Sequence, residues 1–395
     1  MPGPEAVEVN EILSVWRSPL DKVALAGAEA LSDRQPRCSI LGYEDFSAMT
    51  IYNYGFYTNT LAPNAALTSM FSAMNPSSLG AIGGVAFIPQ QSFTIISADG
   101  GFPFAVSDQC NIFSSGTGGS GPPPTPFYHF VINGTGGLTF LSCSGSPYTT
   151  GGTYFHGLAF RWDGSSNVGD TRTLAATGNC CAVRCTFTDC PKAFYAQAPG
   201  CALKQCTIDY GTGPDYATSV VVASSQCAIL GPGELQQQPP FPGTGGGGPQ
   251  NCTCISVQGG ADHTVIADTH ISEWWIGVDF SQGGGSRNTQ IRNCHLQCYI
   301  SPLNIQLNSA GGPIVGVKVT GSTITRTNES GDSFDPAPVV LIDPNGNGNG
   351  LLSDVTLLGC TVWNTGDASA LTGQHGLKII GGTNIKIIDG RSSCT

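Results

Sequence analysis

A short phrase recurs along the C-terminal half of this chain and constrains its fold more than any other feature. Each copy places one small residue among strand-forming residues, at Cys185, Cys206, Thr269, Cys294, Ser322 and Cys360. One such unit cannot bury its own apolar side, so units of this kind stack into a solenoid. The small residues then form a ladder inside the stack, and Cys206, Cys294 and Cys360 are expected to be buried and reduced.

The spacing of the copies favours a β-solenoid over a helical repeat. Successive small residues from Cys185 to Cys360 lie 21, 63, 25, 28 and 38 residues apart, and the gap of 63 leaves room for three turns or for two turns and an insertion. A variable period above about 20 residues suits coils of short strands joined by unequal loops. Val, Ile, Thr and Phe dominate the copies, as strands prefer, and no run has the period of an amphipathic helix.

Residues 264–280 carry a more specific pattern. An aliphatic residue, a small ladder residue and a second aliphatic residue precede a Gly-aliphatic-x-aliphatic ending, at Ile266, Thr269, Ile271, Gly277, Val278 and Phe280. This pattern resembles one coil of the right-handed parallel β-helix proteins.

A second resemblance lies upstream, where a helix-like segment at 64–74 precedes a Gly-Gly-aliphatic-x-aliphatic-x-Pro run at 83–89. This order resembles the opening of the pectate-lyase-like and phage-tailspike group, in which a short helix caps the first coil. The chain departs from the group's pattern at Ala62-Pro63, where Asp usually precedes the helix, and at Gln90-Gln91, where Pro-Gly usually follows the strand.

The resemblance implies an all-β fold: a right-handed parallel β-helix with a short N-terminal helical arm and a capping helix. We expect an arm for attachment at 1–45, the capping helix and first coil at 46–100, and the β-helix at 101–395. Two Gly/Pro-rich stretches, 114–126 and 231–250, cannot hold a core and are expected to be loops inserted between coils.

Composition excludes several classes of protein. With 40% hydrophobic and only 11% charged residues, the chain lacks the signature of a disordered protein. Its net charge of −11, with 16 Lys and Arg and no basic run, argues against nucleic acid as a partner, because that binding depends on attraction to phosphate. The 16 cysteines lack the compact C-x2-C spacing of zinc sites, so we expect neither a metal nor a cofactor.

The N-terminus and the apolar runs bear on location. No apolar stretch approaches the ~18 residues that a membrane helix needs, so we expect no membrane insertion. Residues 1–30 carry Glu5, Glu8, Glu11 and Asp21 in place of the apolar core of a secretory signal. We therefore expect synthesis in a cytoplasm, where cysteines stay reduced.

One coil combines carboxylates, histidines and tryptophans. Alternation places Asp279 between inward Val278 and Phe280, so Asp279 is expected to point outward, and Glu273 stands in the turn before Gly277. Because glycosidases use paired carboxylates, we take Glu273 and Asp279 as candidate acid–base residues. Candidate sugar-binding residues are Asp268, His270, Trp274 and Trp275. Turn formation is the alternative explanation for Asp268, and edge covering or subunit contact is the alternative for the tryptophans.

Two classes of function fit these features. The first is a tailspike-like or tail-associated virion protein that assembles as a homotrimer, attaches to other virion proteins by its arm and presents the β-helix to cell-surface glycan. Within this class the chain either cleaves the glycan, only binds it, or serves as a structural spike. The second is a free pectate-lyase-like or glycoside hydrolase enzyme, which explains the fold but not the missing secretory signal. We favour the first, partly by fold-level analogy.

Overall fold

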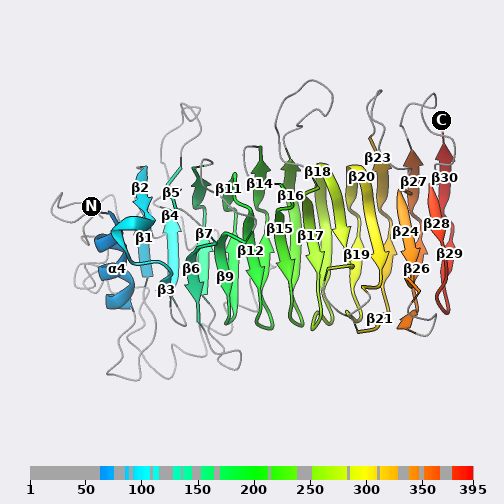
Figure 1. Ribbon diagram of the computed structural model, residues 1–395, viewed down its shortest axis with the longest axis horizontal. Helices are drawn as coiled ribbons and strands as arrows, with labels where there is room; N and C mark the ends of the chain where they lie inside the picture. Colours follow the sequence, from blue (N-terminus) through cyan, green and yellow to red (C-terminus); the bar gives the residue numbers. More distant parts are fainter. Residues whose placement is uncertain are drawn as a thin grey trace, which may run out of the picture.

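The computed structural model describes residues 63–74, 85–88, 92–106, 110–114, 128–134, 137–144, 153–163, 170–211, 215–237, 251–282, 285–308, 312–327, 338–346, 351–364 and 376–394. Over these residues the chain winds into a right-handed parallel β-helix, which confirms the fold predicted from the sequence (Figure 1). Neighbouring coils pair through parallel strands from one end of the stack to the other.

The strands form three long parallel sheets, which we number by their order within a coil. Sheet 1 contains β1 (Val85–Ile88), β4 (Asn111–Ser114), β7 (Thr153–His156), β10 (Cys180–Val183), β13 (Ala202–Lys204), β19 (Gln290–Arg292), β22 (Lys318–Thr320), β26 (Thr356–Leu358) and β29 (Lys386–Ile388). Sheet 2 contains β2 (Phe93–Ile96), β5 (Phe130–Asn133), β8 (Ala159–Trp162), β11 (Thr186–Thr188), β14 (Thr207–Tyr210), β23 (Thr323–Arg326), β27 (Thr361–Asn364) and β30 (Arg391–Cys394). Sheet 3 contains β3 (Phe104–Val106), β6 (Thr139–Cys143), β9 (Arg172–Ala176), β12 (Lys192–Ala196), β15 (Thr218–Val222), β17 (Thr253–Val257), β24 (Val340–Asp343) and β28 (Leu377–Ile379).

Three longer strands run through the corners between sheets. β16 (Ala228–Gln237) passes from sheet 1 to sheet 2, and β20 (His295–Gln306) passes from sheet 2 to sheet 3. β18 (Val265–Asp279) contributes to all three sheets. The short strands β21 (Ile314–Val315) and β25 (Leu352–Ser353) pair with each other, and a 3-10 helix, η1 (Ser97–Asp99), follows β2.

A helix covers the N-terminal end of the described stack, at the position predicted for the cap. Helix α4 (Pro63–Met74) begins with proline, whose fixed φ and missing N–H suit a first turn. It buries apolar side chains such as Met70. The Asn64 side chain holds the helix in place, because its Nδ2 donates hydrogen bonds to the carbonyls of Ile96 (2.6 Å) and Gly100 (2.7 Å).

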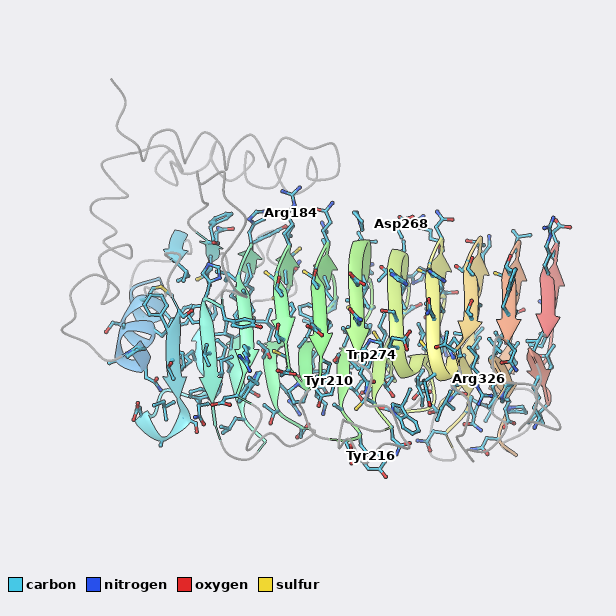
Figure 2. The ribbon with its side chains drawn as sticks, turned by 90° about the horizontal axis from the view of Figure 1, so that it is seen from above. Arg184, Tyr210, Tyr216, Asp268, Trp274 and Arg326 are labelled. Atoms are coloured by element: carbon cyan, nitrogen blue, oxygen red, sulfur yellow. The ribbon has the colours of Figure 1, made fainter. Side chains whose placement is uncertain are left out.

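Inward side chains of the three sheets form one continuous core along the stack. Phe130, Phe160 and Phe187, from successive strands of sheet 2, stack with ring centroids 5.7 and 5.2 Å apart. Tyr210 and Trp274 stack at 5.8 Å near the middle of the solenoid (Figure 2). Since these contacts join different coils, the packing of each coil depends on its neighbours.

The predicted ladder lies inside the corner between sheets 1 and 2. Cys185, Cys206, Cys294 and Cys360 are 0–3% exposed, and their thiols donate to backbone carbonyls at 3.3–3.6 Å. The backbone N–H of Cys185 donates to the Cys206 sulfur (3.4 Å), and that of Cys294 donates to the Ser322 hydroxyl (3.1 Å). Burial raises the pKa of the Cys206, Cys294 and Cys360 thiols. The ladder is therefore confirmed as a column of buried, neutral side chains.

The 63-residue gap in the ladder holds one more position, Gly233, so it contains two turns and an insertion. Gly233 pairs with Thr269, and a Cβ at Gly233 would lie 2.7 Å from the carbonyl oxygen of Cys206. β16 runs on through 231–237, so our expectation of a loop is wrong for these residues. Glycine is needed there because neighbouring backbone leaves no room for a Cβ. Residues 1–45, 115–127 and 238–250 lie outside the described residues.

A second ladder, not predicted from the sequence, lies at the corner where sheet 1 begins. Cys180, Cys201 and Cys227 precede paired residues of successive coils and are 0–2% exposed. Thr264 and Thr289 continue the column, and both are fully buried. The loops before these residues differ in length, so the residues are not evenly spaced in the sequence. Their alignment in one column becomes visible only from the pairing of the strands that follow them.

The ladder predicts how substitutions at Cys294 behave. Cys294→Asp should lower the free energy of unfolding by several kcal/mol, because it buries a charge without a partner. Cys294→Ser should be mild, since Ser322 holds the same column in the next coil. Urea denaturation of the two variants measures the difference. Rapid labelling of Cys294 by a thiol reagent in the native protein would contradict its burial.

A buried histidine lies beside the start of β5. His129 is 4% exposed, and its Nδ1 accepts a hydrogen bond from the N–H of Ala159 (3.0 Å). Its Nε2 therefore carries the proton and donates to Ser114 Oγ (2.9 Å). In this tautomer the imidazole cannot take a proton from Ser114, so the pair is not an activated nucleophile. Burial lowers the pKa of His129 to about 4.

The fold should lose stability as the pH falls from 6.5 toward 4, because the unfolded chain binds a proton that folded His129 excludes. The full shift corresponds to about 3 kcal/mol. His129→Asn keeps an acceptor for the Ala159 N–H but does not titrate, so it should flatten the pH dependence of the urea midpoint over this range. Parallel pH profiles for the wild-type protein and the variant would exclude His129 as the cause.

Candidate functional site

The outward face of sheet 2 carries two columns of mostly polar side chains over seven coils. They are Thr186, Thr207, Glu234, His270, His295, Thr323 and Thr361 in the first column, and Thr188, Asp209, Gln236, Ser272, Gln297, Thr325 and Trp363 in the second. We name these residues the sheet 2 face. Neighbours within a column come from adjacent coils, about 4.8 Å apart.

Glu273 lies at the edge of the sheet 2 face, where β18 bulges. The register of β18 against β20 shifts on either side of Trp274, and Glu273 has a left-handed φ of 62°. Its carboxylate accepts a hydrogen bond from Gln297 Nε2 (3.2 Å). The bulge therefore places a partly exposed carboxylate beside the second column of the face.

The two tryptophans that follow the bulge are buried, so our expectation of an exposed sugar platform is wrong for both. Trp274 is fully buried, stacks on Tyr210, and donates from Nε1 to the carbonyl of Leu235 (2.9 Å). Trp275 is 3% exposed and contacts the ring of Tyr299, 5.8 Å away. The extra residue of the bulge changes which side chain enters the core, and so Trp274 turns inward.

His270 and His295 stack on each other in the first column. Their ring centroids lie 4.7 Å apart and the rings are parallel to within 6°. Nε2 of His270 is buried and has no hydrogen-bond partner among the described residues. Burial and the neighbouring imidazole of His270 lower the pKa of His295. The face thus presents His295 as an uncharged ring at neutral pH.

Asp268 belongs to a corner of the coil and not to the sheet 2 face. Its φ is 55°, and the same left-handed conformation recurs at Arg184, Gln205 and Asn293. Figure 2 shows Arg184 and Asp268 along the same edge of the stack. Asn293 Nδ2 donates to Asp268 (3.3 Å), as Arg184 Nε donates to Gln205 (3.0 Å). The corner conformation explains an Asp here, and the predicted role in sugar binding stays a prediction.

Asp279 faces outward from sheet 3, as alternation predicts, but it is only 1% exposed. Its carboxylate accepts hydrogen bonds from the N–H and hydroxyl of Ser281 (both 3.0 Å) and from Asn304 Nδ2 (2.9 Å). Burial raises the pKa of Asp279, and these hydrogen bonds, with one from Gln282, oppose the rise. Asp279 is therefore held by Ser281 of its own coil and by Asn304 of the next coil, and it is closed to solvent.

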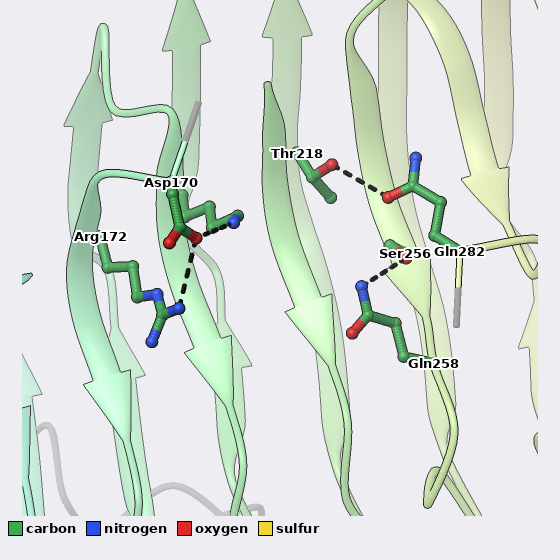
Figure 3. Close-up of polar contacts among 7 residues, drawn as sticks. Asp170, Arg172, Thr218, Ser256, Gln258 and Gln282 are labelled. Carbon is green, nitrogen blue, oxygen red and sulfur yellow. Dashed lines mark hydrogen bonds and ion pairs between the residues drawn. The ribbon is translucent and has the colours of Figure 1, made fainter. Parts of the chain in front are cut away.

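Other polar side chains of sheet 3 also tie coils together. Gln282 accepts a hydrogen bond from Thr218 Oγ1 (3.3 Å), which Figure 3 shows, and donates to Thr253 Oγ1 (3.2 Å), so that it links β15 and β17. Asp170 contacts Lys192 (2.5 Å) and Arg172 (3.3 Å), and the hydrogen bond from Lys192 lowers the pKa of Asp170. These contacts give Gln282 and Asp170 a structural role in joining neighbouring coils.

The structure does not bring Glu273 and Asp279 together as a pair. Glu273 contacts Gln297 beside sheet 2, whereas Asp279 contacts Asn304 within sheet 3. Their predicted acid–base roles remain untested. Of the predicted residues, only His270 lies on the sheet 2 face, with Glu273 at its edge.

Apart from His270, the residues of the face were not identified from the sequence, and His295, Gln297 and Trp363 are the most informative of them. The sequence did contain a sign of their exposure. Each of the three residues stands next to an inward aliphatic residue in a copy of the recurring phrase, which predicts an outward side chain. Trp363 is 46% exposed, while Trp162, Trp274 and Trp275 are 0–3% exposed. The exposed aromatic of sheet 2 thus lies in β27, three coils from the tryptophans that we had chosen.

The described residues contain neither a cluster of metal ligands nor a membrane-spanning helix. No three His, Cys, Asp or Glu side chains among them are placed to hold a metal ion. No helix among them is long and apolar enough to cross a membrane.

Comparisons with known proteins place the fold. No family model and no curated protein matches the chain. A tailspike protein mutant of E. coli bacteriophage HK620, solved in complex with a pentasaccharide, aligns with a TM-score of 0.54 and 13% identity over 85% of this chain and 60% of that one. A double mutant of the same tailspike aligns with a TM-score of 0.55 and 12% identity, with the same coverage.

The match spans 60% of the length of these tailspikes. Identity at this level shows a common fold and leaves ligands and partners to be argued from the residues themselves. The chain therefore has the right-handed parallel β-helix fold that these tailspikes share.

Proposed function

We propose that this chain is a tailspike-like virion protein that uses the sheet 2 face to bind a cell-surface polysaccharide. The sheet 2 face carries this proposal: it sets hydroxyl, amide and imidazole groups in register over seven coils, with an exposed indole in the same column. The similar tailspike protein was solved with a pentasaccharide, which supports the same ligand class here.

The chemistry of the face suits sugar hydroxyl groups. Thr, Ser and Gln side chains both donate and accept hydrogen bonds, and the stacked histidines add ring edges and faces. Over these seven coils neither column contains Lys or Arg, whereas Asp209 and Glu234 lie in the columns and Glu273 lies beside them. Arg161 and Arg391 stand one coil beyond, in register with Thr188 and Thr361. A repeating, uncharged ligand that runs across several coils fits this surface better than a polyanion.

Binding is better supported than cleavage. Paired-carboxylate glycosidases hold their two carboxyl groups about 5–9.5 Å apart with room for substrate or water between them. Here Asp279 is buried and hydrogen-bonded to Ser281 and Asn304, so it is closed to a substrate. Asp279 therefore does not serve as one member of such a pair, and we limit the proposal to binding; the free pectate-lyase-like or glycoside hydrolase enzyme stays the alternative.

The binding proposal is tested with immobilised bacterial surface polysaccharides, neutral and acidic, on a sensor. The wild-type protein should bind at least one of them. His295→Ala and Gln297→Ala should each weaken that binding roughly three- to tenfold, the range expected for one hydrogen-bonding group. Lys318→Ala is the control, because Lys318 is exposed on sheet 1.

Absence of binding by the wild-type protein would refute glycan binding, and the chain would then be better explained as a structural spike. Wild-type affinity in both face variants would place the binding surface elsewhere. Circular dichroism of each variant checks that the β-helix is intact.

The virion setting includes three further proposals: synthesis in the host cytoplasm, attachment to other virion proteins through residues 1–45, and assembly as a homotrimer. They rest on the tailspike-like fold and on the composition of residues 1–45, and the trimer contact is proposed outside the sheet 2 face, so that Trp363 stays open to glycan. Closed cyclic symmetry would bury one sheet face of each copy.

Virion membership and assembly are directly measurable. Mass spectrometry of purified virus particles should detect the chain as a particle component. Light scattering of the purified protein at micromolar concentration should give three times the mass of one chain. A chain absent from particles would end the virion proposal, and a monomer would end the homotrimer proposal.

A further inference from the structure

Trp363 holds an unusual position for a tryptophan in this chain. In β27 the burial alternates, so that Val362 faces the core at 5% exposure and Trp363 faces outward at 46%. The other described tryptophans fill the interior or contact rings at a corner. Packing therefore explains the burial of those side chains but not the outward, half-exposed indole of Trp363.

Pairing fixes what surrounds this indole. Trp363 lies in register with Thr325 of β23, which lies in register with Gln297 of β20. The neighbouring column places Thr323 and Thr361 beside them. At about 4.8 Å per coil, Gln297 lies roughly 10 Å from Trp363 along the stack. On the other side β30 continues the sheet, with Ser393 in register with Trp363 and Arg391 in register with Thr361. The indole is thus joined to a row of uncharged hydrogen-bonding side chains that leads back to Glu273 and the histidine pair.

We propose that Trp363 is a stacking platform for one uncharged pyranose unit, a hexose or an N-acetylhexosamine, of a glycan bound on the sheet 2 face. This inference rests on the proposed function and names the ligand class and one binding residue. The indole offers a flat apolar surface for the C–H face of the sugar, while hydroxyl groups at the rim of that sugar reach Thr325 and those of the next unit of the glycan reach Gln297.

The same geometry selects against anionic sugars. The face of an aromatic ring is electron-rich, so a carboxylate of a uronic acid is repelled above Trp363. Glu273, which contacts Gln297, adds a negative charge along the row. Within the seven coils of the sheet 2 face neither column contains Lys or Arg. Arg161 and Arg391 lie one coil beyond the face, in register with Thr188 and Thr361, so the only side-chain charge beside Gln297 in the row is that of Glu273.

The test compares Trp363→Ala and Trp363→Phe with the wild-type protein. The probes are chitohexaose, dextran, a panel of neutral O-antigen polysaccharides, and polygalacturonate as the anionic member. The wild-type protein should bind a neutral probe and not polygalacturonate. Trp363→Ala should weaken neutral binding at least about tenfold, as expected for a tryptophan that dominates a contact, and Trp363→Phe should recover part of the loss.

Tyr216→Ala is the matched control, because Tyr216 is an aromatic side chain 73% exposed at the edge opposite Asp268 (Figure 2). It should bind as the wild-type protein does. Tryptophan fluorescence gives a second readout: bound glycan should shield Trp363 from iodide quenching, and this protection should vanish in Trp363→Phe.

The outcomes separate the two proposals. Wild-type binding that is unchanged in Trp363→Ala would overturn the role of Trp363 and leave glycan binding by the chain intact. Wild-type binding to polygalacturonate alone would overturn the neutral ligand class. Absence of wild-type binding to every probe would overturn both proposals.

Discussion

The structure depends on one constraint: each coil must stack in register on the next, because no coil can bury its apolar side alone. The ladders show how strictly this holds. Cys206 leaves so little room above it that only glycine fits at position 233 of the next coil, and the sulfur of Cys206 accepts the backbone N–H of Cys185 on its other side. Small side chains at the corners allow the backbone turns of successive coils to approach closely, and the three sheets follow from that spacing.

Register also decides which side chains reach solvent. The single extra residue at Glu273 shifts the register of β18 against β20. The inward and outward side chains therefore alternate in opposite phase before and after this bulge. As a result Trp274 enters the core, where it stacks on Tyr210, and Glu273 moves to the edge of sheet 2 beside Gln297. A change of one residue in register exchanges the inner and outer faces of a strand, so a bulge can relocate a site without changing any side chain in it.

The polar groups on the outward faces of sheet 2 and sheet 3 differ in what they do. On sheet 3, Asp279 and Gln282 are occupied by hydrogen bonds within and between coils, so their polarity stabilises the stack. On sheet 2, Gln297, Thr325 and Trp363 lie in one row, and the indole of Trp363 in that row is exposed. This division supports a binding role for sheet 2 and a structural role for the carboxylate of sheet 3.

The sequence by itself determined the β-helix, the capping helix near 64–74 and the ladder through Cys294, because these depend on periodic residue types that local reading detects. It also placed Asp279 on an outward face. Only the tertiary structure decided that Asp279 is closed to solvent, that Trp274 is a core residue and that Trp363 is exposed. Those outcomes depend on pairing register, on a bulge and on contacts between coils many residues apart, and none of these is encoded in the local pattern of a single strand.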